Sequence, residues 1–336
     1  MTPIKHILVI RLSSMGDVAM TVPIIRLVAI QHPKIKISIL TKLAYVEIFR
    51  EFAHANIIAL DNKKHNGFFG LIKLFKELKS LDINYVIDLH NVLRTNILKI
   101  LWRNNFYQIK KGRYEKKELV NGKKFHQLKS THQRYLETFN CLNLNLSLSH
   151  HKFPKKTELK NLKLISNNGF TKKIIGIAPF AKHKGKTYSL QKITILTEKL
   201  SLNNTILLFG GGQKEAGQLE KIATKNKNIF NLAKDLPLNS QLDYISNLDL
   251  MISMDSANGH LAAMYGVKVL TIWGITHPYA GFAPFNQPIK NSITVDRNKF
   301  PKIPTSIYGN KHPKGYQGAI NTISVEEIIK KIEEIF

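Results

Sequence analysis

The chain has 336 residues and a mass of 38.3 kDa, which suits two domains of roughly 150–170 residues better than one core. Apolar residues make up 43% and charged residues 22%, so the composition excludes a disordered chain. No run of about 18 apolar residues occurs, and Arg11 and Asp17 interrupt the apolar N-terminus, which argues against a spanning helix and a signal peptide. The single cysteine, Cys141, excludes an internal disulfide and a cysteine-based zinc site, so we expect a cytoplasmic protein.

Positive charge is the unusual feature, because 50 Lys and Arg face 23 Asp and Glu for a formal net charge of +27. Residues 1–165 hold 29 basic and 11 acidic side chains, and residues 166–336 hold 21 and 12. This excess favours an anionic partner near the first half, although a lysine-rich coding bias would produce the same numbers. Nucleic acid is the alternative partner, but no helix-turn-helix, RNP, KH or finger signature accompanies the charge. We therefore expect no nucleic-acid partner.

The first half alternates strand and helix patterns, as an open, doubly wound α/β sheet does. A β-branched run at Lys5–Leu12 precedes a polar turn and an amphipathic helix at Val18–Gln31. Further strands are predicted at Ile35–Leu40, Ile57–Leu60 and Tyr85–Asp88, with helical periodicity around Gly70–Leu81. The pattern breaks down over Gln108–Arg134, which predicts a mobile basic loop that leads into a helix at His132–Asn140.

The second half repeats this alternation after a polar, irregular stretch at 143–172. Its predicted strands are Ile174–Ala178, Thr205–Phe209, Leu248–Met254 and Val267–Trp273. Its predicted helices are Ser189–Leu200, Lys214–Lys225, His260–Tyr265 and Ser324–Phe336, the last capped by Ser324 and Glu327. We therefore expect a first domain at 1–155 with a basic loop at about 108–131, a linker at 156–172, a second domain at 173–322 and a C-terminal helix at 323–336.

Three polar loops follow predicted strands, at the edge where open α/β sheets bind ligands. The loop at 13–17 offers a helix start for an anion and carries Asp17, although capping the helix is an ordinary role for aspartate. Glycines 210–212 allow close approach of a diphosphate and Glu215 follows them, but a tight turn and a dipole-stabilising acid give the same pattern. The segment Met254–Ala263 leaves room for a phosphate before a helix, and its His260 is more often a structural residue in such a place.

Taken together, these motifs resemble glycosyltransferase family 9, the lipopolysaccharide heptosyltransferases. Arg11–Val18, with Pro23 behind it, is similar to the opening signature of that family. Asp255–Leu261 is similar to its D-[ST]-G-x-x-H motif, and Gly274–Pro278 to its G-x-T-x-P turn. The resemblance implies a GT-B architecture of two Rossmann-like, doubly wound domains facing each other across a cleft, the first for the acceptor and the second for the nucleotide sugar. It also implies that the C-terminal helix packs back on the first domain.

The resemblance assigns roles residue by residue. Asp17 matches the general base, Lys186 the lysine at the donor diphosphate, and Glu215 the acid at the ribose. The implied donor-binding residues are Lys186, Gly211, Gly212, Glu215, Leu236, Asp255, Ser256, Ala257, Asn258, Gly259 and His260. The implied acceptor-binding residues are Arg11, Ser13, Ser14, Met15, Gly16, Lys63, Lys64, Arg94, Arg113, His132 and Arg134. Two departures bear on the donor loop: Ala257 replaces the usual glycine, and Ala181 and Lys182 replace the usual threonines.

The function implied is an inverting, metal-independent transfer of heptose from ADP-L-glycero-D-manno-heptose to the Kdo/lipid A inner core of lipopolysaccharide. No Asp-x-Asp pair suited to a divalent cation occurs, so we expect no metal site and no cofactor beyond the donor. The expected partners are the nucleotide sugar, an anionic glycolipid and, peripherally, anionic lipid at the inner face of the cytoplasmic membrane, with a monomer as the default. Another nucleotide sugar or acceptor, or a non-catalytic protein that binds sugar nucleotides or nucleic acid, remains the alternative.

Overall fold

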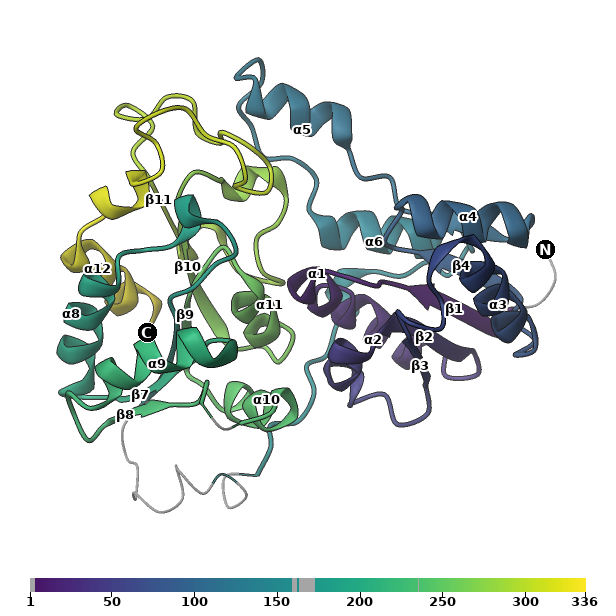
Figure 1. Ribbon diagram of the computed structural model, residues 1–336, viewed down its shortest axis with the longest axis horizontal. Coiled ribbons are helices and arrows are strands. Elements are labelled where there is room, and N and C mark those ends of the chain that lie inside the picture. Colours follow the sequence, from purple (N-terminus) through teal and green to yellow (C-terminus); the bar gives the residue numbers. More distant parts are fainter. Residues whose placement is uncertain (1–3, 159–161, 163–172, 235) are drawn as a thin grey trace. The chain divides into compact units, whose positions relative to one another are not determined.

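The computed structural model describes residues 4–158, 162, 173–234 and 236–336, and the chain divides into two compact α/β units (Figure 1). The first unit comprises Met1–Lys111 and Thr131–Pro154, and the second comprises Gly112–Ser130 and Lys155–Phe336. Most of the expected linker, at 159–161 and 163–172, lies outside the described residues. Within the described ranges, no helix is long and apolar enough to cross a membrane.

The first unit is built on a five-stranded parallel sheet in the order β3-β2-β1-β4-β5. Its strands are β1 (His6–Ile10), β2 (Lys36–Lys42), β3 (Asn56–Leu60), β4 (Tyr85–Asp88) and β5 (Phe106–Gln108). All five residues of β1 are buried, because a parallel sheet covered on both faces needs continuous apolar runs. Ile7 pairs with Ile37 on one side and with Tyr85 on the other, so the strand order reverses at β1 and β4. Ligands of open α/β sheets bind at such a reversal, outside the carboxyl ends of the strands.

The helices of the first unit differ in part from the predicted ones. They are α1 (Met15–Ala19), α2 (Val22–Gln31), α3 (Gly67–Lys79), α4 (Leu93–Trp102) and α6 (Thr131–Asn140), with short 3-10 turns η1 (Leu43–Phe49) and η2 (Leu148–His150). The single helix expected at Val18–Gln31 is wrong, because the chain breaks at Thr21 and starts α2 afresh. Pro23 stands in the first turn of α2, where the missing N–H costs nothing, whereas inside a longer helix it would remove a hydrogen bond. The sequence patterns did not predict η1, α4 and β5.

The second unit holds a six-stranded parallel sheet in the order β11-β10-β9-β6-β7-β8. Its strands are β6 (Ile174–Ala178), β7 (Thr205–Leu208), β8 (Ile229–Asn231), β9 (Leu250–Met254), β10 (Lys268–Trp273) and β11 (Ser292–Thr294). Its helices are α8 (Leu190–Ser201), α9 (Gly212–Ala223), α10 (Leu238–Ser246), α11 (Ala257–Ala263) and α12 (Val325–Ile335), with 3-10 turns η4 (Lys184–Lys186), η5 (Pro278–Ala280), η6 (Ile289–Asn291) and η7 (Ala319–Thr322). Here the order reverses at β6 and β9, so both units are doubly wound and the expected fold class is confirmed.

The C-terminal helix α12 belongs to the core of the second unit. Its cap is as expected, since the Ser324 backbone N–H donates to Glu327 Oε2 at 2.6 Å and the Glu327 N–H donates to Ser324 Oγ at 3.1 Å. Val325, Ile328, Ile332 and Ile335 lie on one face, and all four join the apolar cluster of that unit. The helix therefore buries its apolar stripe in the second unit, which differs from the expectation that it packs back on the first.

Residues 112–130, which we call the excursion, stand between two segments of the first unit in the sequence but belong to the second unit. The excursion contains α5 (Arg113–Val120), so the prediction of a loop is wrong over the residues of this helix. Gly112 precedes α5 with a φ of +62°, in the left-handed region that glycine tolerates. Leu119 and Leu128 are buried with Ala280, and the partly buried Phe125, Tyr279, Phe282 and Ile307 pack around them. Two apolar anchors among many lysines are too few to give a clear helical pattern in the sequence.

Candidate active site

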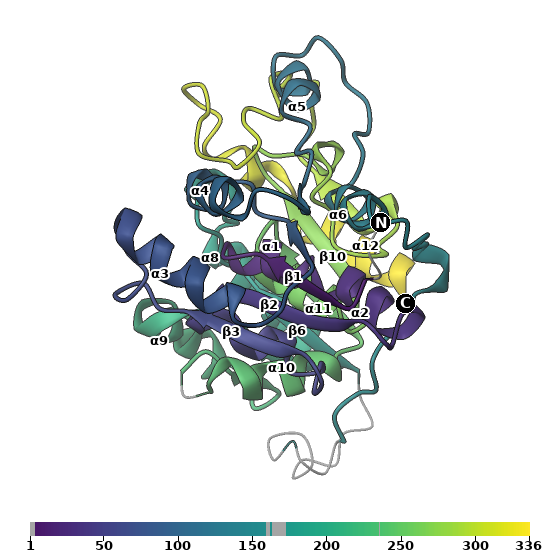
Figure 2. The ribbon, with the colours of Figure 1, turned by 90° about the vertical axis from the view of Figure 1, so that its right-hand side faces the viewer.

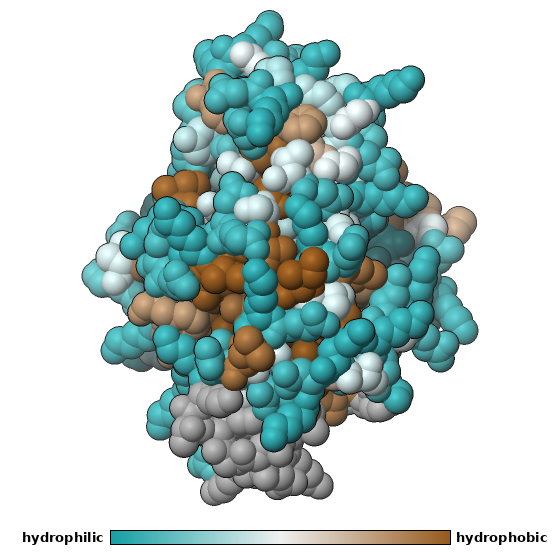
Figure 3. All heavy atoms as spheres, turned by 90° about the vertical axis from the view of Figure 1, so that its left-hand side faces the viewer, coloured by the Kyte–Doolittle hydropathy of each residue, from teal (hydrophilic) through white to brown (hydrophobic). Residues whose placement is uncertain are grey.

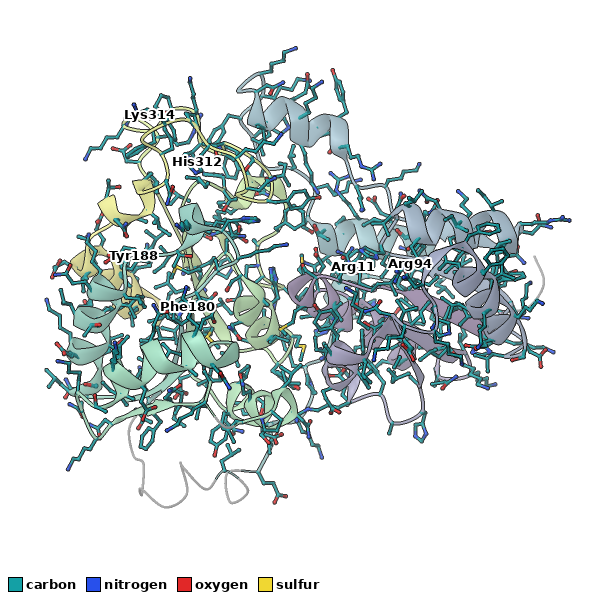
Figure 4. All side chains as sticks on the ribbon, in the orientation of Figure 1. Arg11, Arg94, Phe180, Tyr188, His312 and Lys314 are labelled. Carbon is teal, nitrogen blue, oxygen red and sulfur yellow. The ribbon has the colours of Figure 1, made fainter. Side chains whose placement is uncertain are left out.

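The loop after β1 holds Asp17 by one carboxylate oxygen. Arg11 Nη2 lies 2.8 Å from Asp17 Oδ2, and Ser14 donates to the same oxygen from its hydroxyl at 2.7 Å and from its backbone N–H at 3.2 Å. Arg11 is buried at the end of β1, where Figure 4 labels it, and its Nη1 donates to Leu89 O at 2.6 Å. The Asp17 side chain is 24% exposed. Asp17 thus caps the first turn of α1 and also presents a fixed, ion-paired carboxylate to solvent at the reversal of the sheet.

Residues after β4 complete this edge, and the sequence did not single them out. His90 Nε2 lies 3.5 Å from Ser13 Oγ, and Lys111 Nζ donates to Asn91 O at 3.1 Å. Burial lowers the pKa of His90 to about 3, and the nearby charges of Arg11 and Lys111 lower it further in the same direction. His90 is therefore neutral at physiological pH. Its position two residues after a central strand is the signal that could have found it.

Helix α6 contacts the backbone of the Asp17 loop. The Tyr135 hydroxyl donates to the backbone O of Asp17 at 3.4 Å, and Arg134 Nη1 donates to Lys110 O at 3.3 Å. His132 and Arg134 are both buried, so they hold the framework rather than line an open surface. Burial lowers the pKa of Arg11, but Tyr135 and Asp17 more than offset this and raise it, so Arg11 remains a cation.

The other residues that the resemblance assigns to the acceptor are spread over both units. Lys63 and Lys64 lie in an exposed turn, where both backbone N–H groups donate to Asp61 Oδ1, and Lys64 Nζ also lies 2.8 Å from Glu77 Oε1. Arg94, in the first turn of α4, donates to Asn62 Oδ1 at 3.3 Å (Figure 4). Met15 and Gly16 form the first turn of α1. Arg113 is exposed at the start of α5. This helix belongs to the second unit, whereas the sequence analysis placed Arg113 in the first domain.

In the second unit, Lys186 and Asp255 meet at the reversal of the sheet. Lys186 Nζ lies 2.9 Å from Asp255 Oδ2, and Thr276 donates to that same oxygen from Oγ1 at 2.8 Å. The Lys186 and Asp255 side chains are only 13% and 11% exposed. These residues come from the segments that follow β6, β9 and β10, so three strand ends converge on one ion pair.

Two glycines allow this convergence. A Cβ on Gly274 would stand 2.1 Å from the carbonyl oxygen of Gly185, and one on Gly185 would stand 2.3 Å from Ile275 Cδ1. The close approach lets the Ile275 N–H donate to Gly185 O at 3.1 Å. A side chain at Gly274 would meet backbone, which explains the glycine there, whereas one at Gly185 would displace the Ile275 side chain.

The other residues that the resemblance assigns to the donor belong to the same unit. Gly211 donates its N–H to Glu215 Oε2 at 2.8 Å at the start of α9, and Gly212 has a φ of +75°. Leu236 is half-buried before α10, and its carbonyl accepts from Gln241. Ala257 and Asn258 form the first turn of α11, Ser256 precedes it, and His260 is buried within it. The Ser256 hydroxyl oxygen is buried without a hydrogen-bond partner.

No three His, Cys, Asp or Glu side chains gather closely enough to hold a metal ion in the part of the chain that the structure describes. What the two units offer is a carboxylate at one sheet edge and a lysine with a small-residue loop at the other. Both groups stand at the carboxyl edge of a doubly wound sheet, where open α/β folds bind their ligands.

The chain belongs to glycosyltransferase family 9 (heptosyltransferase), whose family profile matches residues 71–314. It is accordingly a glycosyltransferase. The lipooligosaccharide heptosyltransferase 2 of Campylobacter jejuni subsp. jejuni serotype O:6 is 23% identical to it over 327 residues, which cover 96% of each chain.

Solved structures are similar over nearly the whole chain. A glycosyl transferase family 9 structure from Veillonella parvula has a TM-score of 0.77 at 17% identity and covers 100% of this chain and 98% of that one. The E. coli heptosyltransferase WaaC with ADP has a TM-score of 0.68 at 18% identity and covers 98% of this chain and 100% of that one. At this identity, the likeness concerns the fold.

Proposed function

We propose that this enzyme transfers heptose from ADP-L-glycero-D-manno-heptose to the Kdo/lipid A inner core of lipopolysaccharide, with inversion and without a metal ion. The names of the relatives support heptose and a lipopolysaccharide or lipooligosaccharide acceptor. The ADP bound in the E. coli structure supports an adenine nucleotide donor. The alternative is another nucleotide sugar, and Ala257 in the donor loop is the residue that keeps it open.

The observation that carries the proposal is the anchoring of Asp17. A general base needs a carboxylate within about 3 Å of the attacking hydroxyl, in its ionised form and with little freedom to rotate. Arg11 places a positive charge beside Asp17 Oδ2, and Ser14 donates a hydrogen bond to the same oxygen, so the orientation of the carboxylate is fixed. The Asp17 side chain remains partly exposed. In the proposed step, Asp17 takes the proton of the acceptor hydroxyl as its oxygen bonds to the anomeric carbon. The bond from that carbon to the diphosphate breaks on the opposite face, which inverts the configuration, and ADP leaves.

The leaving diphosphate gains negative charge, and the second unit offers groups to stabilise it. Lys186 would exchange part of its ion pair with Asp255 for the phosphate oxygens. The unpartnered hydroxyl of Ser256 and the first turn of α11 would add hydrogen bonds. Glu215 would accept from the ribose, as the resemblance implies, after releasing the N–H of Gly211. These groups support charge stabilisation by the protein itself.

The acceptor side is proposed more coarsely. Lys63, Lys64 and Arg94 would contact the phosphates and acidic sugars of the acceptor, while the buried His132 and Arg134 would keep the Asp17 loop in place. We propose that the enzyme is a cytoplasmic monomer that contacts the inner face of the membrane peripherally.

The test is a mass-spectrometric transfer assay with ADP-heptose and Kdo-lipid A in the presence of EDTA. The wild type should add one heptosyl mass, and Asp17→Asn should lower turnover by about 10²–10⁴ while donor binding is unchanged. Lys186→Met should instead weaken donor binding by about tenfold or more, because a charge-assisted contact is lost. Asp82→Asn is the control: this exposed carboxylate stands just before β4, at the opposite end of that strand, and should leave both quantities unchanged.

Transfer from a different nucleotide sugar, with none from ADP-heptose, would reject heptose and keep the base assignment. Near wild-type turnover by Asp17→Asn would remove Asp17 from the mechanism. Loss of product in EDTA with recovery on adding a divalent cation would reject metal independence.

A further inference from the structure

Large apolar side chains stand unusually exposed on two neighbouring helices of the first unit. Phe69 is 85%, Leu93 78% and Ile100 75% exposed, the three highest values among the large hydrophobic residues that the structure describes. Phe68, beside Phe69, is 57% exposed. Single exposed apolar side chains are common on protein surfaces, but several on adjoining elements mark an interaction site. We call Phe68, Phe69, Leu93 and Ile100 the α3–α4 patch.

The two helices that carry these exposed side chains pack side by side (Figures 1 and 2). Their inner faces are joined by the edge-to-face contact of Phe75 and Trp102, whose ring centroids are 5.8 Å apart. Leu93 and Ile100 are seven residues apart and therefore lie on one stripe of α4. The hydrogen bond from Arg94 to Asn62 ties the start of α4 to the turn before α3.

Basic side chains flank the patch. Helices α3 and α4 carry five basic residues and a single acidic one, Glu77, which is already paired with Lys64 and His65. Lys73 and Lys76 are exposed, four and seven residues after Phe69, and so lie on its stripe. Exposed aromatic and aliphatic side chains with lysines beside them suit a membrane interface, where acyl chains meet anionic headgroups.

The patch also lies at the functional edge of the sheet. Helices that follow parallel strands begin at the carboxyl edge, and Phe68, Phe69 and Leu93 are all in first turns. The Asp17 loop is at the same edge of the same sheet. A surface at this edge would hold a lipid-borne acceptor within reach of the base.

We infer that the α3–α4 patch docks on an anionic lipid bilayer, with Phe68, Phe69, Leu93 and Ile100 entering the headgroup region and Lys73 and Lys76 meeting the headgroup phosphates. The inference rests on the proposed function for its purpose, since a lipid-linked acceptor is what docking would present. A second copy of the chain is the less suitable occupant, because its own net charge of +27 would face these lysines.

The experiment is co-sedimentation of the full chain with vesicles of phosphatidylglycerol and phosphatidylcholine in equal parts, and with phosphatidylcholine alone. Wild-type protein should bind the anionic vesicles and not the neutral ones. Phe69→Ser with Leu93→Ser should weaken binding by about tenfold or more, and Lys73→Gln and Lys76→Gln by about fivefold each. Leu202→Ser with Ile289→Ser is the matched control, since these side chains are 66% and 56% exposed on the second unit and should leave binding unchanged.

Each variant is also assayed for transfer to detergent-dispersed acceptor and for oligomeric state by light scattering. Transfer by the wild type without vesicle binding, or vesicle binding equal in the patch and control variants, overturns the docking surface and leaves the proposed function standing. A wild-type dimer that the patch substitutions dissociate overturns it as well, because a second copy then covers the patch. Vesicle binding that depends on the patch, in a protein that transfers no heptose, upholds the surface and rejects the proposed activity.

Discussion

Gly259, in the segment proposed to bind the donor, approaches the sheet closely. It lies in α11, and a Cβ there would stand 2.5 Å from Oγ of Ser253, a fully buried residue of β9. We predict that Gly259→Ala destabilises the protein by about 1–3 kcal/mol, because a packed interior resists even one added methyl group. Thermal unfolding of the purified variant measures the effect.

Removing the clashing oxygen should reverse this loss. In the double variant Gly259→Ala with Ser253→Ala, the Cβ gains space and most of the stability should return. Gly217→Ala is the control, since it lies in α9 with no atom within 4 Å of the added Cβ and should be neutral or slightly stabilising. Equal destabilisation of the single and double variants would show that the Ser253 contact is not the cause.

Contacts were predictable where the residues stand in one motif after a strand. The structure brings Arg11, Ser14 and Asp17 of the first motif together. It also pairs Lys186 with Asp255, which the resemblance assigned separately to the donor and not to each other. Contacts between distant parts of the sequence could not be foreseen. Tyr135 reaches the backbone of Asp17 across 118 positions, and no local pattern encodes such a pairing. The burial of Arg134 was missed for the same reason, because a charged residue is usually exposed.

Among the elements, the excursion at 112–130 is the one whose attachment can be tested most directly. The Phe125 ring lies 4.9 Å from both His277 and Tyr279, and the Arg297 guanidinium lies 3.4 Å from its centroid. We predict that Phe125→Ala detaches the segment and increases tryptic cleavage after Lys123, Lys124 and Lys129 by about tenfold, because a lost cation–π contact and apolar anchor together exceed about 1 kcal/mol. Limited proteolysis with mass spectrometry measures the rate.

Tyr114→Ala provides the comparison for this element. Tyr114 is 73% exposed on α5 and makes one hydrogen bond to Glu118, so its loss should leave cleavage close to the wild-type rate. If both variants are cut equally fast, the aromatic cluster does not hold the excursion.

The elements that the sequence predicted are those with long apolar runs or strong caps. The central strands β1, β4, β6 and β9 and the helices α3, α8, α9 and α12 match their predicted positions closely. Edge strands β5, β8 and β11 have three residues each, which is too short for a period to be recognised. Helix α5 was not predicted because its burial depends on a partner surface about 160 residues further along the chain, at Tyr279 and Phe282.

The whole molecule carries a large positive charge on a surface that is mostly hydrophilic, with a band of apolar side chains across the face shown in Figure 3. Like charges at this density repel one another and oppose compactness, an effect that salt screens over about 10 Å at 0.1 M. Three histidines held neutral by the fold add a second dependence on solution conditions. Burial is the main cause in each case, and a nearby arginine is the second. The pKa of His90, near Arg11, is lowered to about 3. The pKa values of His151, near Arg26, and His277, near Arg297, are lowered to about 4.

These pKa values fix the sign of the pH dependence. Above about pH 6.5 the histidines are neutral in both the folded and the unfolded chain, and the full stability is present. Below it the unfolded chain binds protons that the folded chain does not, so stability falls as the pH drops toward 4. The free energy of unfolding can fall by at most about 1.4 kcal/mol per histidine per pH unit. The fall is smaller for the half-exposed His90 and His151, because solvent screens them. We therefore predict lower urea midpoints at pH 5 than at pH 7.5, and a larger gain from added salt at pH 5, where the net charge is higher.

His277→Asn isolates one of the three groups. His277 Nδ1 accepts the Tyr279 N–H at 3.2 Å, which requires that nitrogen to be unprotonated, and an asparagine oxygen can accept the same bond without titrating. The urea midpoint of His277→Asn should therefore depend less steeply on pH between 6.5 and 5 than that of the wild type. A wild-type slope in this variant would mean that His277 takes up its proton equally in both states, and that the acid sensitivity of the molecule arises from its overall charge.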